Sequence, residues 1–499
     1  MTLRGRTLVI FFSQAVTQAV TVGLGIVMVH LLSQELYGSY RQVQLISTFV
    51  TAVLGLQIPA SLYYFVPKLP RDHRRQIVVQ SVGLSCLLGL AAGVIMIASA
   101  NLLAKSFGNE ALAPLLRVYA PFPLASLILS LVPAFAISLD LPVHAGVYTL
   151  ASALARALPA VVLASLGASL GTILLGTVAT SLLLSAWGVL MMWSRSAGPS
   201  WSGWDLLGPQ ISYVIPLSLA SLVGVANRQV DQFLISLHFD PARYAVYAAG
   251  AFELPVVGIV TASVGNAIMP DLVSRYDQGR ITEVLQIWHA SVRRCSLVIY
   301  PVFAWAIFSA RDLITALYPE SYGEAVWPFS VYLFELPLRV AVYGSLLRAC
   351  GRTTPVAVGA AIALIVNASV GFLLVRFGGS GRLAFVGPSI GAAAAEVAAV
   401  AYLICSAART TGVGTTRLMP WSYLGRTLCV AIAAGAGSGI VVLADLPLVA
   451  RLAGRTAVFL ALFGLLAFRS GVLGSEELAM LRRGWRTALV KAGQGDRRS

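Results

Sequence analysis

About fourteen separate apolar stretches, each long enough to cross a bilayer as a helix, constrain what this chain can fold into. A crossing needs about 20 apolar residues to span ~30 Å of hydrocarbon. Only 11% of the residues are charged and 58% are hydrophobic, which excludes a water-soluble fold and a disordered chain. The sequence therefore predicts an all-α polytopic membrane protein with spans near residues 7–32, 42–66, 77–103, 112–138, 142–166, 170–193, 210–237, 242–270, 292–315, 325–349, 354–376, 384–408, 422–444 and 448–470.

The basic residues between these spans are distributed unequally. If the N-terminus is cytoplasmic, 23 Lys and Arg residues lie on the cytoplasmic side and 9 on the opposite side, where Arg41 is counted in the first connection. Cytoplasmic segments of membrane proteins carry such an excess, so both termini are predicted to be cytoplasmic. The net charge of +15 then reflects topology, and no nucleic-acid partner is expected.

Short motifs recur in the same order in two parts of the chain, which indicates a duplication of six spans. The matching pairs are Tyr37-Gly38-Ser39-Tyr40 with Tyr244-Ala245-Val246-Tyr247, Gly167 to Gly171 with Gly387 to Gly391, and Pro142-Val143 with Pro355-Val356. Six spans separate the copies, so the two halves have the same orientation and a pseudo-two-fold axis along the membrane normal. A transport cavity is expected between them.

This repeat gives the predicted domain organisation. It consists of an N-terminal six-helix lobe (1–193), a cytoplasmic linker (194–209), a C-terminal six-helix lobe (210–408), two additional transmembrane helices (409–470) and a cytoplasmic amphipathic basic tail (471–499).

The two Gly-x-Ser-x-Gly motifs, Gly167 to Gly171 and Gly387 to Gly391, resemble the nucleophile elbow of hydrolases. That elbow follows a strand, whereas each motif here is predicted to open an apolar helix, so no hydrolase site is expected.

Charged residues inside the spans are the candidate functional groups. A charge at a helix centre costs about 2.5–3.5 kcal/mol on insertion scales unless it faces water or a partner. Arg228 and Asp231 are three positions apart and Glu335 and Arg339 are four apart, so each pair either neutralises itself on one helix face or lines a transport pathway. Arg156 lies deep in the fifth span.

Two further intramembrane groups have no charged neighbour in sequence. Glu253 and Glu396 are either buried neutral acids or carriers of a coupling proton. In the first span Gln14 and Gln18 belong to a polar stripe at helical spacing, which either lines the cavity or hydrogen-bonds to neighbouring helices.

Enzyme and cofactor motifs are missing from the sequence. None of the three lysines (Lys68, Lys105 and Lys491) follows a glycine in a nucleotide-binding P-loop, and the five histidines have no metal-binding spacing. We therefore expect no metal, no cofactor and no catalytic residues. The five cysteines form no Cys-x-x-Cys pair and are predicted to be small apolar residues.

Several segments together resemble a known family. They are Asn227 to Ile235, Tyr244 to Ala249, Met269 to Ser274, Leu36 to Tyr40 and Gly387 to Ala394. In this combination the chain resembles Wzx-type polysaccharide-biosynthesis flippases of the multidrug/oligosaccharidyl-lipid/polysaccharide (MOP) exporter superfamily, over roughly residues 7–410.

This resemblance implies a MATE-like fold in the bacterial cytoplasmic (inner) membrane. It also implies a carrier that moves undecaprenyl-pyrophosphate-linked oligosaccharide to the outer leaflet by alternating access for cell-surface polysaccharide biosynthesis. Membrane lipids and other polysaccharide-assembly proteins are the implied partners. The residue that matches the family's cavity arginines is Arg228, with Arg156 and Arg339 as further candidates from depth alone, and Asp231, Gln14 and Gln18 complete the predicted binding set.

Two alternatives remain open from the sequence. The predicted intramembrane acids Asp231, Glu253, Glu335 and Glu396 are ion-coupling candidates and favour a cation-coupled multidrug or toxin exporter of the same superfamily. A membrane polysaccharide polymerase or glycosyltransferase is the minor alternative, since the chain has neither a long external loop nor an acidic catalytic cluster.

Overall fold

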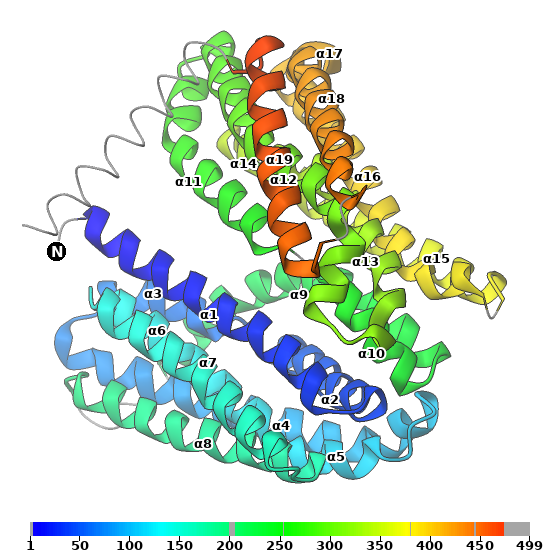
Figure 1. Cartoon of the computed structure of the whole chain (residues 1–499). Helices are drawn as coiled ribbons and strands as arrows, with labels where there is room; N and C mark the ends of the chain where they lie inside the picture. The colour runs from blue at the N-terminus through cyan, green and yellow to red at the C-terminus, as the bar shows by residue number, and fades with distance from the viewer. Residues whose placement is uncertain (1–2, 199–204, 253, 380, 444–445, 474–499) are drawn as a thin grey trace, which may run out of the picture. The chain divides into compact units, whose positions relative to one another are not determined.

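The fold is described from a computed structural model that covers residues 3–198, 205–252, 254–379, 381–443 and 446–473. Every regular element in these ranges is a helix (Figure 1). Glu253, residues 199–204 of the predicted linker and the predicted tail from residue 474 lie outside the described residues.

The chain divides into two compact units, which are described separately. The first comprises Met1–Phe252, Leu317–Pro328 and Ala360–Ala398. Its complete elements are α1 (Leu3–Leu31), α2 (Gln34–Leu54), α3 (Ile58–Lys68), η1 (Arg71–His73), α4 (Arg74–Ser106), α5 (Leu112–Tyr119), α6 (Phe122–Ser138), α7 (Pro142–Ser165), α8 (Leu170–Ser194), α9 (Leu207–His238), α10 (Pro241–Gly250) and the 3-10 helix η2 (Glu320–Ala325).

The second unit comprises Glu253–Ala316, Phe329–Gly359 and Ala399–Ser499. It holds α11 (Pro255–Asp277), nearly all of α12 (Ile281–Leu317), η3 (Leu336–Val340), α14 (Tyr343–Ala349), α17 (Thr415–Leu418), α18 (Trp421–Ser438), η4 (Gly439–Leu443) and α19 (Leu448–Arg469). Four of the described helices have residues in both units: α12, whose last residue Leu317 belongs to the first unit, α13 (Val326–Leu333), α15 (Thr354–Phe377) and α16 (Arg382–Thr411).

The number of predicted spans is confirmed. Among the described residues, twelve helices are long and apolar enough to cross a membrane, or up to fourteen if each of two bent pairs forms one span. Many of these helices expose large apolar side chains, as α8 does with Leu183 (72% exposed) and Leu190 (67% exposed). Such surfaces are stable in lipid because the helix satisfies its own backbone hydrogen bonds and needs no water.

Four predicted spans are not single straight helices, which corrects the sequence-based boundaries. The span predicted at 42–66 consists of α2 and α3, bent by 43°, and the span at 112–138 consists of α5 and α6, bent by 41°. Between α2 and α3 the backbone of Leu56 and Gln57 is left-handed (φ 44° for both), a conformation that ends a right-handed helix. Between α5 and α6 the chain passes Pro121, which lacks a donor N–H.

The other two breaks also precede prolines. The span predicted at 242–270 is interrupted after α10, and α11 begins at Pro255. The span predicted at 325–349 is divided into α13, η3 and α14, with Pro337 at the start of η3. A proline fits the first turn of a helix because its missing N–H would have no partner there, so each proline suits the helix that follows the break.

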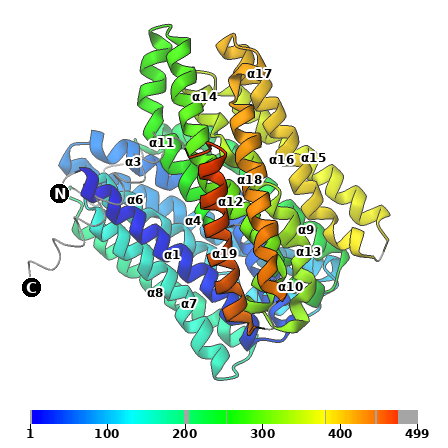
Figure 2. The same cartoon turned by 45° about the horizontal axis from the view of Figure 1, so that its top comes forward.

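The first unit has a close-packed core and buried polar links between helices. Helices α4, α6, α7 and α8 lie side by side in both views (Figures 1 and 2). Leu62, Ile77 and Phe135 are fully or almost fully buried in this core. Gln210 at the start of α9 donates to the hydroxyl oxygens of Ser61 and Ser81, both at 2.8 Å, so the helix after the linker is tied to α3 and α4.

The two helices that carry the tyrosine motifs of the predicted repeat, α2 and α10, pack against each other. Both copies stand at capped helix starts, since Ser33 caps α2 and Asp240 caps α10. Gly38 of α2 lies so close to the backbone of Pro241 in α10 that a side chain at position 38 would overlap it. The second Gly-x-Ser-x-Gly motif, Gly387 to Gly391, was predicted to open a helix. This prediction is wrong, because the motif lies inside α16, which begins at Arg382.

In the second unit α18 and α19 pack side by side and against α12 (Figure 2). Asp312 of α12 forms ion pairs with two arginines of α19, Arg451 at 3.1 Å and Arg455 at 2.9 Å, and Arg455 also donates a hydrogen bond to it. Asp312 and Arg455 are buried. These ion pairs fix the start of α19 to the end of α12.

Candidate functional site

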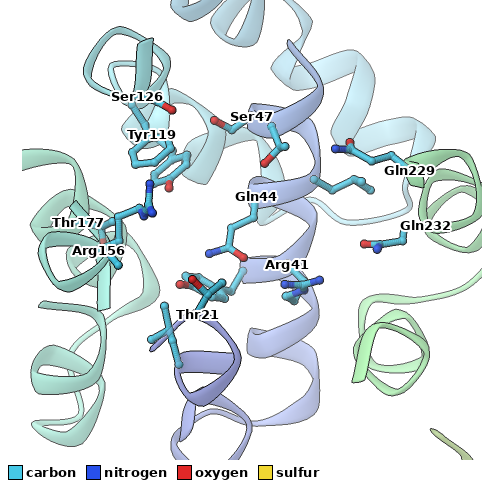
Figure 3. A pocket seen from close by; sticks show the side chains of 16 residues that line it. Thr21, Arg41, Gln44, Ser47, Tyr119, Ser126, Arg156, Thr177, Gln229 and Gln232 are labelled. Atoms are coloured by element: carbon cyan, nitrogen blue, oxygen red, sulfur yellow. The ribbon is translucent and has the colours of Figure 1, made fainter. Parts of the chain in front are cut away.

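A polar cavity of about 470 Å³ lies within the first unit (Figure 3). Helices α1, α2 and α5 to α9 contribute its walls. Most of the lining side chains carry a hydroxyl, an amide or a guanidinium group: Thr21, Tyr40, Arg41, Gln44, Ser47, Thr48, Tyr119, Ser126, Arg156, Thr177, Gln229 and Gln232. The lining includes two arginines and no Asp or Glu, so the cavity is cationic.

Helix α2 supplies much of this lining through one face. Tyr40, Arg41, Gln44, Ser47 and Thr48 all line the cavity. Their spacing of three to four residues places them on neighbouring turns of the same side of a helix. The helix begins early enough to include them because Ser33 caps it, with its hydroxyl accepting from the N–H of Leu36 at 3.4 Å.

The two arginines are partly buried and hold no carboxylate partner in the part of the chain that the structure describes. Arg41 comes from α2 and Arg156 from α7. The Nε atom of Arg41 is buried without a hydrogen bond to any described residue. A guanidinium group stays charged even at low dielectric, so each of these arginines offers an uncompensated positive charge to a ligand.

Helix α9 lines the cavity with amides. The hydroxyl of the fully buried Tyr244 donates to Oε1 of Gln232 at 3.1 Å. This bond occupies the carbonyl end of the Gln232 amide and leaves its NH2 group as a donor. Gln229, three residues earlier, lines the cavity as well.

Of the predicted binding residues, Arg156 lines this cavity and the others lie elsewhere. Arg228 is exposed on α9 and Asp231 is buried there (3% exposed), with the Tyr247 hydroxyl donating to its Oδ2 at 3.3 Å. Gln14 and Gln18 are exposed on α1, whereas Thr21 of the same polar stripe lines the cavity. Roles for these residues stay predictions.

Among the described residues, the other charged groups predicted to lie inside spans do not line this cavity, and each has a different environment. Glu335, which is buried, and Arg339 form an ion pair of 2.7 Å in the second unit, so the local pairing considered from the sequence is present. Glu396 is partly buried in α16 and has an interaction partner. Glu253 lies outside the described residues. No group of three His, Cys, Asp or Glu side chains suited to a metal ion occurs in the described ranges.

Arg41 is the main residue that the sequence reasoning missed. Hydropathy predicts that the second span begins at residue 42, which places Arg41 in an external connection, whereas α2 begins at Gln34. The available signal was Ser33 followed by Glu35, a typical helix start, together with polar residues at helical spacing from Arg41 to Thr48.

The sequence comparisons identify the family. A family model described as polysaccharide biosynthesis protein matches residues 27–327, which is more than half of the 499 residues. The chain belongs to the polysaccharide biosynthesis protein family. The resemblance found in the sequence is thereby confirmed. No curated protein sequence matches this polysaccharide biosynthesis protein.

Solved structures establish the fold of this polysaccharide biosynthesis protein. It is similar to the lipid II flippase MurJ in an inward closed conformation, with a TM-score of 0.72 at 13% identity over 93% of this chain and 99% of that one. It is also similar to an inward-facing multidrug resistance MATE family transporter of the MOP superfamily, with a TM-score of 0.64 at 13% identity over 79% of this chain and 96% of that one. A MOP superfamily transporter from Pyrococcus furiosus aligns with a TM-score of 0.56 at 14% identity, over 81% of this chain and 94% of that one. The protein therefore has the MOP fold.

Proposed function

We propose that this protein is a flippase that moves a polyprenyl-diphosphate-linked oligosaccharide from the cytoplasmic to the outer leaflet of the bacterial cytoplasmic membrane. The observation that carries this proposal is the cationic cavity, with Arg41 and Arg156 in its lining and no carboxylate. Membership of the polysaccharide biosynthesis protein family and the fold shared with a lipid II flippase support it.

The chemistry of the cavity suits such a substrate. A guanidinium group donates two parallel hydrogen bonds to phosphate oxygens, and charge-assisted bonds of this kind are about twice as strong as neutral ones. Hydroxyls and amides of Thr21, Gln44 and Ser126 can bond to sugar hydroxyls. The cavity therefore offers groups for both polar parts of the substrate, while its prenyl chain stays in the lipid.

Transport requires that this cavity opens in turn to each side of the membrane. Alternating access by two six-helix lobes, residues 1–193 and 210–408, is the mechanism we propose, with the other two transmembrane helices (409–470) outside the repeat. No covalent step is needed, so the protein acts as a transporter and not as an enzyme. Membrane lipids and other polysaccharide-assembly proteins are the proposed partners.

The direct test is translocation by purified protein in liposomes. A fluorescent oligosaccharide linked by a diphosphate to a short prenyl chain is placed in one leaflet, and its appearance in the other is followed with a membrane-impermeant quencher. We expect transport by the wild type, a strong loss in Arg41→Gln and Arg156→Gln, and no loss in Arg376→Gln, which alters an exposed arginine at the end of α15. Absence of transport by wild-type protein, together with normal polysaccharide export in a deletion strain, would refute the proposal.

A cation-coupled multidrug exporter is the second candidate, favoured by one observation. Asp231 is buried in α9 and held by the Tyr247 hydroxyl, next to Gln232 of the cavity wall. A buried carboxyl of this kind can bind and release a coupling cation. This candidate predicts drug efflux that Asp231→Asn abolishes, and unchanged drug sensitivity of a deletion strain counts against it.

A further inference from the structure

The two cavity arginines lie on different walls. Arg41 projects from α2 and Arg156 from α7, and the side chain of Gln44 lies between them (Figure 3). If one diphosphate binds at Arg41, then Arg156, on the other side of Gln44, faces another part of the substrate. An arginine without a carboxylate partner in the cavity favours an anionic group on that part of the substrate, because the two can form a charge-assisted hydrogen bond.

The surroundings of the two arginines assign the diphosphate to Arg41. Gln232 lies on the same side of the cavity as Arg41 (Figure 3), and its oxygen already accepts from Tyr244. Its NH2 group is therefore a donor beside the Arg41 guanidinium. Several donors and a full positive charge match the many acceptor oxygens of a diphosphate.

The surroundings of Arg156 suit a single carboxylate. The guanidinium of Arg156 lies beside the hydroxyl of Tyr119 (Figure 3). The nearby hydroxyl of Thr177 donates to the backbone oxygen of Ile173 at 3.0 Å and has no further proton to donate. The planar fork of one arginine is itself sufficient to bind one carboxylate through two parallel hydrogen bonds.

The size of the cavity limits which part of the substrate can reach Arg156. A volume of about 470 Å³ is typical of sites for small molecules, which range from ~300 to 1,000 Å³. Such a space encloses the diphosphate and the sugar next to it, but not a whole oligosaccharide. Recognition by Arg156 is therefore directed at the sugars nearest the lipid carrier.

Building on the proposed function, we propose that the transported glycan carries an acidic sugar close to its diphosphate, and that Arg156 binds the carboxylate of this sugar. Arg41 and Gln232 bind the diphosphate in every substrate. Arg156 then determines specificity, because it favours substrates with a carboxylate at the right distance from the diphosphate.

A matched pair of probes tests this assignment. One is glucuronic acid and the other glucose, each joined through a diphosphate to a farnesyl chain, so that the two differ in a carboxylate against a hydroxymethyl group. Dissociation constants for both are measured with the full-length protein in lipid nanodiscs. We expect the wild type to bind the acidic probe at least about tenfold more tightly than the neutral probe. A tenfold ratio of dissociation constants corresponds to the free energy of one hydrogen bond to a charged group.

The variants separate the two roles through the ratio of the two dissociation constants. In Arg156→Gln the ratio should fall to about one, and Arg156→Lys should retain part of the preference because it keeps the charge. In Arg41→Gln both probes should bind more weakly while their ratio is preserved. Thermal unfolding of each variant in nanodiscs confirms that the protein is folded, and Arg376→Gln serves as the matched surface control.

Three results would overturn this inference. A wild-type ratio near one means that the cavity does not distinguish an acidic sugar. An equal loss of both probes in Arg156→Gln means that both arginines clamp the diphosphate, and this result leaves the proposed flippase function intact. Binding of neither probe by the wild type overturns this inference, and the transport assay in liposomes then shows whether the proposed function fails as well.

Discussion

At the scale of single residues, the buried ion pairs of Asp312 are a sensitive point of the second unit. Asp312 is shared by Arg451 and Arg455. Asp312→Asn removes the carboxylate charge and leaves the buried Arg455 without its counterion, which typically costs about 3–5 kcal/mol. We expect a marked drop in the thermal unfolding temperature in detergent, whereas Arg311→Gln, at the exposed neighbouring position, should have little effect. Equal stability of the two variants would show that the ion pairs contribute nothing.

Single residues also show how far the sequence predicts the cavity. Arg156 was found because a lone charge deep in an apolar stretch needs a polar neighbour, and it lines the cavity. Arg41 was missed because it stands near the end of a span, where apolar windows do not locate a helix start reliably. The exposed position of Arg228 depends on the rotation of α9, which the pattern of residues within one helix does not determine.

At the scale of helices, the close approach of α2 to α10 depends on a glycine. A Cβ atom on Gly38 would overlap the backbone of Pro241, and backbone gives way less easily than a side chain. Gly38→Ala should therefore lower the unfolding temperature and reduce transport.

The matched control is Gly23→Ala, since a Cβ at position 23 of α1 meets no other atom within 4 Å. Replacing a helical glycine by alanine without a clash stabilises by about 0.5–1 kcal/mol. The two substitutions should therefore shift the unfolding temperature in opposite directions. A shift in the same direction for both would contradict close packing at Gly38.

Helices as a class were the most predictable level of the structure. Their number follows from hydropathy because lipid requires each crossing segment to satisfy its own backbone. The breaks before Pro255 and Pro337 had a signal in the proline itself. The bend at Leu56 and Gln57 had no such signal in the sequence, because neither leucine nor glutamine favours a left-handed backbone.

At the scale of the whole molecule, the distribution of basic residues predicts the orientation in the membrane. The structure places Arg41 inside α2, so it no longer counts among the external basic residues. The excess of Lys and Arg on the cytoplasmic side is therefore larger than the sequence alone indicated. In a background with the five native cysteines replaced by serine, Gln278→Cys should be labelled by an impermeant thiol reagent only after cell lysis. Glu110→Cys should be labelled in intact cells. The reverse pattern would invert the topology and the proposed direction of transport.

The contact between α2 and α10 also limits how the sequence of the protein can change. These two helices carry the two copies of the tyrosine motif, and Gly38 faces Pro241 where they touch. Because the backbones of the two helices touch at this glycine, neither helix can take a larger residue there unless the other shifts. The two parts of the chain that carry the motif are therefore constrained to change together.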